Sequence, residues 1–159
     1  MKNVVFVFLL AFFVSPVFSQ TKEAEKFDTL TTSLCCEALW TKLDFYLVEL
    51  QKQPLSTGYL IFYEGKIGGC SGLPKKLPKR GAAENRARII RNYLVKARGI
   101  DPLRLIIING GGREEWTAEL WIVRQGAKEP TPTPTIDSKD IKFKKGKLRV
   151  KDYEFPDCV

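Results

Sequence analysis

Residues 84–105 read ENRARIIRNYLVKARGIDPLRL, and this stretch decides the fold class. Together with the preceding Ala83, its helical part has apolar residues spaced three or four apart, at Ala87, Ile90, Leu94 and Ala97. Gly99 stands where the end of a helix favours glycine, and an Asp-Pro pair then turns the chain. The run LRLIIIN at residues 103–109 predicts a buried strand. The expected unit is therefore an amphipathic helix followed by a strand.

The flanking segments extend this unit in both directions. A second helical stripe precedes it at Leu39, Leu43, Tyr46, Leu47 and Leu50. GYLIFYE at residues 58–64 predicts a buried strand, and EEWTAELWIV at residues 114–123 predicts a strand with alternating faces. A first strand is expected within residues 20–33. The order predicts an α+β fold, a two-layer sandwich with a mixed sheet and helices on one face, of βαβαββ type.

The domain is expected to span residues 20–126. KEPTPTPT follows Gly126, and residues 127–135 are interpreted as an extended Thr/Pro linker. The basic tail, residues 136–159, contains IKFKKGKLRV, whose alternating pattern around Gly146 predicts a hairpin.

Residues 1–19 resemble a secretory signal peptide. Lys2 precedes the apolar run VVFVFLLAFFV, and SPVFS ends at Ser19, so cleavage is expected before Gln20. The run is shorter than the ~20 residues that span a bilayer. The alternative is an uncleaved membrane anchor. We expect a periplasmic or extracellular protein with no transmembrane segment in the mature chain.

The formal net charge of +8 favours polyanionic partners. Export argues against nucleic acid as the physiological partner. Cell-wall polymers, lipid head groups and acidic proteins remain.

The four cysteines are Cys35, Cys36, Cys70 and Cys158. In an oxidising compartment their even number predicts two disulfides. Adjacent cysteines rarely bond each other, so one of Cys35 and Cys36 is expected to pair with Cys70 and the other with Cys158. The sequence has no histidine and no CxxC spacing, which argues against a metal site.

No constellation in the sequence favours an enzyme or a cofactor. Histidine, the commonest general base, is absent. Glu114 and Glu115 are adjacent on an expected strand and so point to opposite faces. The glycines at residues 110–112 lack the lysine and the helix of a phosphate-binding loop and predict a turn.

The cations of the helix divide by their position around it. Arg88 and Lys96 lie away from the apolar stripe, as an ordinary solvated face would. Arg86 lies at the edge of the stripe, where its guanidinium is expected to emerge beside the helix N-terminus. A planar donor fork at that place suits a carboxylate or a phosphate.

At these residues the chain resembles the OmpA-like, peptidoglycan-associating domain of bacterial envelopes. The matching residues are Arg86-Ala87, Ile90, Tyr93-Leu94, Gly99-Ile100 and Arg104-Leu105, with one extra residue before Gly99. The resemblance covers roughly residues 35–124. It implies that Arg86 holds the diaminopimelate end group of peptidoglycan. The family's partner aspartate has no counterpart, since residues 65–83 contain no acidic residue.

The leading hypothesis is a secreted, non-catalytic envelope protein that binds peptidoglycan or another anionic wall polymer. Its candidate ligand-binding residues are Arg86, Lys75, Lys76, Lys79 and Arg80. The alternative is an envelope interaction scaffold that has lost peptidoglycan binding and uses Trp121 as an interface anchor. Trp121 has a second interpretation, packing beneath the basic tail or the disulfide. A secreted basic effector or inhibitor is a third hypothesis, which has no motif of its own.

Overall fold

The structure, a computed structural model, describes residues 23–68 and 74–155. The expected signal peptide, Cys70 and Cys158 lie outside these ranges. The main elements are β1 (Glu25–Thr31), α1 (Cys36–Lys52), β2 (Thr57–Lys66), α2 (Ala82–Asn92), β3 (Leu105–Glu115) and β4 (Thr117–Val123). The strands form one mixed sheet in the order β1-β4-β2-β3, in which β2 and β3 are parallel and β4 is antiparallel to β1 and β2.

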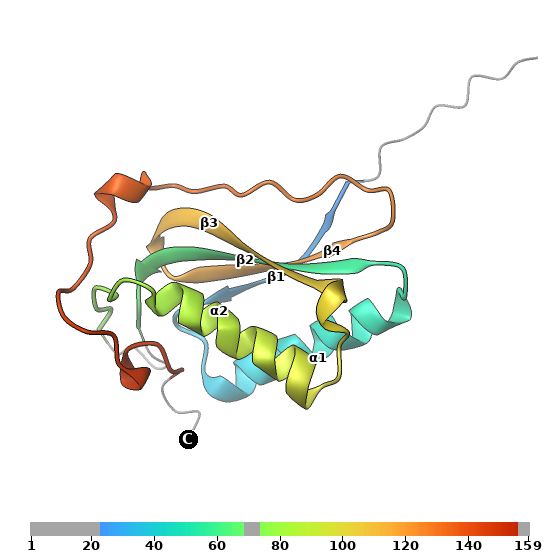
Figure 1. Ribbon diagram of the computed structural model, residues 1–159, viewed down its shortest axis with the longest axis horizontal. Helices are drawn as coiled ribbons and strands as arrows, with labels where there is room; N and C mark the ends of the chain where they lie inside the picture. Colours follow the sequence, from blue (N-terminus) through green and yellow to red (C-terminus); the bar gives the residue numbers. More distant parts are fainter. Residues whose placement is uncertain (1–22, 69–73, 156–159) are drawn as a thin grey trace, which may run out of the picture.

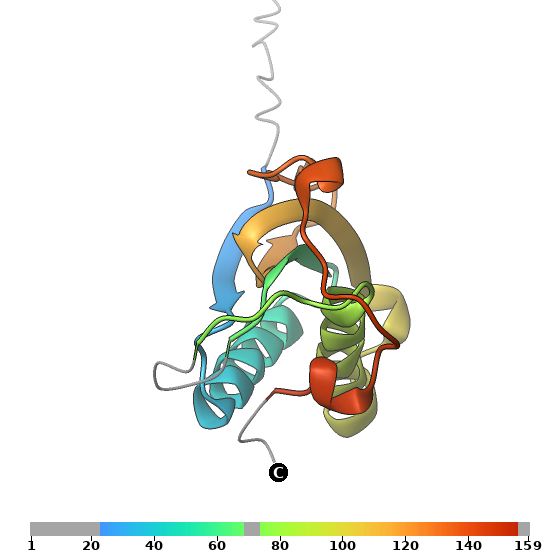
Figure 2. The same ribbon diagram turned by 90° about the vertical axis from the view of Figure 1, so that its left-hand side faces the viewer.

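Both helices cover the same face of the sheet (Figures 1 and 2). Side chains alternate along the central strands, so Leu60 and Phe62 of β2 and Leu120 of β4 point into the layer shared with the helices. The inner stripes of the helices meet them; for example, Leu43 and Ile90 have no exposed surface. The predicted α+β class, with a two-layer sandwich, is confirmed.

The second helix continues past α2 as a π-helical turn, Tyr93–Ala97. A π turn accommodates one more residue than an α turn. The residues after this turn are therefore rotated from their α-helical positions, and Ala97, expected on the buried stripe, is exposed to solvent. Gly99 ends the helix with φ +75°, a left-handed conformation that glycine adopts without strain.

Residues 127–136, which we call the strap, run across the other face of the sheet (Figure 1). Pro130 is buried, the Tyr59 hydroxyl donates to Glu129 at 2.7 Å, and the backbone N–H of Ile136 donates to the carbonyl of Gly112 at 3.0 Å. The Thr/Pro segment is extended, as expected. It packs on the domain as the second cover of the sheet.

The strap closes over a buried charge network. The Glu119 carboxylate, on a side chain only 3% exposed, accepts hydrogen bonds from Lys26 at 2.6 Å, Arg113 at 2.9 Å and the Tyr63 hydroxyl at 3.0 Å. The same hydroxyl accepts the backbone N–H of Thr133 in the strap at 3.1 Å. One carboxylate therefore connects β1, β3, β2 and the strap.

Within the basic tail, residues 141–155 descend beside the N-terminal end of α2 (Figures 1 and 2). From here on, the tail means residues 141–155. The prediction of a hairpin at Ile141–Val150 is wrong, since no strand forms there. The physical reason is that backbone groups of the tail form hydrogen bonds with the domain, whereas a hairpin would pair them with each other. The backbone N–H of Lys144 donates to the carbonyl of Pro78 at 2.8 Å, and the tail contains a short 3-10 turn, η4 (Val150–Asp152).

Candidate anion-binding pocket

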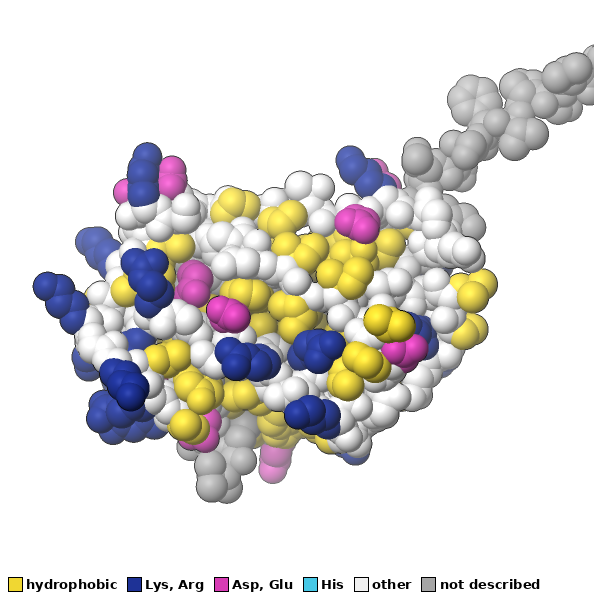
Figure 3. All heavy atoms as spheres, viewed as in Figure 1, with side chains coloured by type: hydrophobic (Ala, Val, Ile, Leu, Met, Phe, Trp, Pro, Cys, Tyr) yellow, Lys and Arg dark blue, Asp and Glu magenta, His cyan; other side chains and the backbone are white. Residues whose placement is uncertain are grey.

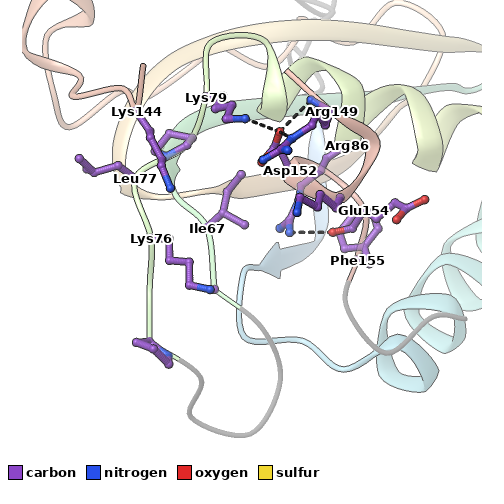
Figure 4. A pocket seen from close by; sticks show the side chains of 14 residues that line it. Ile67, Lys76, Leu77, Lys79, Arg86, Lys144, Arg149, Asp152, Glu154 and Phe155 are labelled. Carbon is purple, nitrogen blue, oxygen red and sulfur yellow. Dashed lines mark hydrogen bonds and ion pairs between the residues drawn. The ribbon is translucent and has the colours of Figure 1, made fainter. Parts of the chain in front are cut away.

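A pocket of about 560 Å³ lies between the basic loop, residues 74–80, and the tail (Figure 4). The N-terminal part of α2 contributes Arg86 to it. Its apolar walls come from both sides: Ile67, Leu77, Pro78 and Phe155.

Cations outnumber carboxylates in this lining. The six cations are Lys76, Lys79, Arg86, Lys144, Arg149 and Lys151, against the two carboxylates Asp152 and Glu154. Four of the six are exposed: Lys76, Lys144, Arg149 and Lys151. Dark blue side chains gather at the same end of the molecule in the space-filling view (Figure 3). The pocket therefore presents positive charge over an apolar surface.

Arg86 does not emerge at the surface as expected; it is only 1% exposed. The tail covers it. Its guanidinium donates to the backbone carbonyls of Tyr153 at 3.2 Å and Glu154 at 3.1 Å. The ring centroids of Trp116 and Phe155 lie 5.2 and 4.8 Å from its central carbon, distances at which a ring face attracts a cation.

Arg86 forms no ion pair with a carboxylate in the described part of the chain. Burial lowers the pKa of this guanidinium to about 10, because a charge removed from water loses its solvation. In the described part of the chain, two tail carbonyls and two aromatic rings replace the solvation that the guanidinium loses. Arg86 therefore holds the tail in this structure.

Lys79 has a comparable position and is 7% exposed. Its ammonium group lies 2.8 Å from the Asp152 carboxylate and donates to the carbonyl of Lys147 at 2.7 Å. The hydrogen bond from Lys79 lowers the pKa of Asp152 below its usual value. Asp152 also accepts the backbone N–H of Arg149 at 2.7 Å. Lys79 thus holds the tail at two points, the carbonyl of Lys147 and the carboxylate of Asp152 in the last turn.

The other loop cations predicted to bind the ligand do not all line the pocket. Lys76 is exposed and lines the pocket. Lys75 instead pairs with Glu115. Arg80 lies over the ring of Phe143, 4.5 Å from its centroid, in a neighbouring hollow of about 430 Å³. The structure therefore brings together Lys76, Lys79 and Arg86 of the five candidates.

Three cations of the pocket were not predicted from the sequence: Lys144, Arg149 and Lys151 of the tail. The alternating cations of residues 141–150 were the available signal. The expectation of a hairpin assigned them to a separate element. Their position depends on where the tail docks, which local periodicity does not report.

Trp121 is half-buried on the face of the sheet opposite the helices. Its indole N–H donates to Glu119 at 3.2 Å, and the Lys26 ammonium lies 5.7 Å from its ring centroid. It belongs to the Glu119 network. Its role as an interface anchor stays a prediction.

The adjacent cysteines have different surroundings. Cys35 is exposed, and its thiol is free, against the prediction that both neighbours are bonded. The reason is geometric: Cys35 caps α1 from outside, whereas Cys36 begins the helix and turns into the core, 7% exposed. The partners predicted for Cys36 lie outside the described residues, so its pairing stays a prediction.

Residues 23–68 and 74–155 contain no cluster of three or more cysteine, aspartate or glutamate side chains that could hold a metal ion. Over the same residues, no helix has the length and apolar character needed to cross a membrane.

Compared with known proteins, the chain matches no protein-family model and no curated sequence.

Proposed function

We propose that the chain is a secreted, non-catalytic protein of the bacterial envelope that binds peptidoglycan or another anionic wall polymer in the pocket between the basic loop and the tail. The observation that carries the proposal is the lining itself. Four exposed cations surround an apolar surface that only two carboxylates share.

A polymer suits such a pocket better than a single small anion. An exposed ion pair contributes only about 0.2–1 kcal/mol, so one contact at the rim binds weakly. Repeated carboxylates on one polymer engage several cations at once, and linked contacts raise the overall affinity. The apolar walls accept the uncharged parts of the repeating unit. The expected signal peptide and the resemblance of residues 35–124 to a wall-binding family support the same class of partner.

The proposal differs from the family's mode in the role of Arg86. Its two hydrogen bonds to tail carbonyls leave the exposed lysines as the groups that meet the ligand first. Lys76 approaches from the loop, and Lys144 and Lys151 from the tail.

Co-sedimentation with purified peptidoglycan sacculi tests this function. Lys76→Gln with Lys151→Gln removes two exposed pocket cations and is expected to weaken retention about threefold or more. Lys96→Gln with Lys128→Gln is the matched control, because it removes two exposed cations outside the pocket lining. Equal retention of the two double variants contradicts the proposal, since binding would then follow net charge alone.

The nature of the anion is tested on the same material. Amidation of the sacculus carboxylates is expected to abolish retention if peptidoglycan carboxylates are recognised. Retention that survives amidation and is lost after phosphate-containing polymers are removed assigns the ligand to those polymers.

An interaction scaffold is the second candidate, and a feature of α1 favours it. Phe45 and Val48 are three residues apart on one face of the helix and are 64% and 47% exposed. Apolar side chains exposed together are typical of protein-binding surfaces. Phe45→Ser with Val48→Ser should abolish recovery of an envelope protein by the immobilised chain. Recovery equal to that of wild type contradicts this candidate.

A further inference from the structure

The tail is fixed to the domain at several independent points. Lys79 pairs with Asp152 and donates to the carbonyl of Lys147, and Arg86 donates to two further tail carbonyls. Phe155 is 7% exposed, with its ring 5.6 Å from that of Trp116. Figure 4 shows the Lys79–Asp152 pair and the Arg86–Glu154 hydrogen bond on one side of the pocket.

The same docked segment supplies half of the pocket's cations. Lys144, Arg149 and Lys151 belong to the tail, as does the apolar wall at Phe155. If the tail leaves, the loop and α2 retain Lys76, Lys79 and Arg86, but the opposite wall is lost. A pocket needs both walls to surround a ligand.

We infer that docking of the tail assembles the anion-binding pocket, and that Arg86 and Lys79 are positioning residues that act through the tail. This inference rests on the proposed function. It adds that the two most buried cations of the site serve the ligand indirectly. The ligand meets the exposed cations that their contacts hold in place.

Asp152 and Glu154 allow a test that separates docking of the tail from electrostatic attraction alone. For Asp152→Asn the two explanations predict opposite changes in affinity for the anion. Both carboxylates line the pocket, so neutralising either one makes the pocket more positive. If electrostatics alone governed binding, both variants would bind an anion more tightly. Asp152, however, also holds Lys79, whereas the side chain of Glu154 makes no hydrogen bond or ion pair in the described part of the chain.

The experiment measures the dissociation constant of the full chain for soluble peptidoglycan fragments released from sacculi by a muramidase. Glu154→Gln is expected to bind about twofold more tightly than wild type. Asp152→Asn is expected to bind at least about threefold more weakly, because loss of a charged partner loosens the tail. Tighter or unchanged binding by Asp152→Asn overturns the inference.

A second readout follows the tail without a ligand. Backbone amides of residues 150–155 should exchange with deuterium faster in Asp152→Asn than in wild type, and unchanged in Glu154→Gln. Equal exchange in both variants overturns the docking role of Lys79. Wild type that binds no fragment overturns the proposed function and the assembled pocket with it, while the exchange rates still report whether Lys79 holds the tail. The two failures are therefore distinguishable.

Discussion

Glu119→Gln is expected to be the most destabilising isosteric substitution in the sheet. The carboxylate is 3% exposed and accepts from Lys26, Arg113, Tyr63 and Trp121. Breaking a buried ion pair on one side typically costs about 3–5 kcal/mol. The Lys26 side chain is 41% exposed and regains water, which reduces this cost. We therefore expect a loss of about 2–3 kcal/mol in the free energy of unfolding.

Urea denaturation at neutral pH measures this loss. At a denaturant slope of about 2 kcal/mol per molar, the middle of the usual range, the expected shift of the midpoint is about 1–1.5 M. Glu115→Gln is the matched control, since Glu115 and its partner Lys75 have side chains 35% and 46% exposed. An exposed pair of this kind is worth less than about 1 kcal/mol. Equal midpoints for the two variants would refute the assignment of Glu119 as the centre of the network.

The same carboxylate predicts the pH dependence of stability. Burial raises its pKa, but the hydrogen bonds from Lys26 and Arg113 outweigh burial, so the pKa lies below the ordinary value of 4.5. The unfolded chain thus binds the proton at higher pH than the folded chain does. The stabilisation is complete above pH ~4.5 and is lost as the pH falls through the folded-state pKa. Glu119→Gln should flatten this part of the stability curve; an unchanged acid limb contradicts the argument.

Three further predictions concern other parts of the fold. Gly58→Ala should cost about 1–3 kcal/mol in urea denaturation, because a Cβ there meets the Tyr46 hydroxyl; a smaller loss means that Tyr46 can shift. Arg104→Gln should speed amide exchange at the C-terminal end of α1, because the guanidinium donates to the carbonyls of Leu50 and of the C-cap residue Gln53 at 2.8 and 2.9 Å; unchanged exchange there argues against capping. In the native protein an alkylating reagent should modify Cys35 and spare buried Cys36, as peptide mapping would show; equal labelling contradicts the difference in burial.

The layer of helices and strands followed from local periodicity. The stretch at residues 84–105 predicted a helix, its glycine end and the strand after it, because apolar residues in a helix and in a strand have different spacings. The strand is not buried as expected, since it lies at the sheet edge and Leu103 and Ile106 are 86% and 38% exposed. The turn predicted at residues 110–112 is also wrong, because β3 continues through these glycines to Glu115. The alternation at residues 114–123 predicted a strand with two different faces, and in the structure Trp116 and Leu120 lie on the inner one.

The positions of the strap and the tail could not be predicted from periodicity. These positions depend on single contacts with distant residues, such as Tyr63 with Thr133 and Lys79 with Asp152. Such contacts leave no local pattern in the sequence. For the same reason, Arg86 was correctly predicted to lie near the N-terminus of α2, but its guanidinium was wrongly predicted to be at the surface.

Binding of the purified full chain to intact and carboxyl-amidated sacculi, at low and high salt, tests the central claim most directly. Wall binding through the pocket predicts retention on intact sacculi that falls at high salt, because exposed charges are screened within about 10 Å at 0.1 M ionic strength. It also predicts that Lys76→Gln with Lys151→Gln reduces this retention while Lys96→Gln with Lys128→Gln preserves it. No retention on intact sacculi, or retention indifferent to salt and to all four substitutions, would contradict wall binding through the pocket.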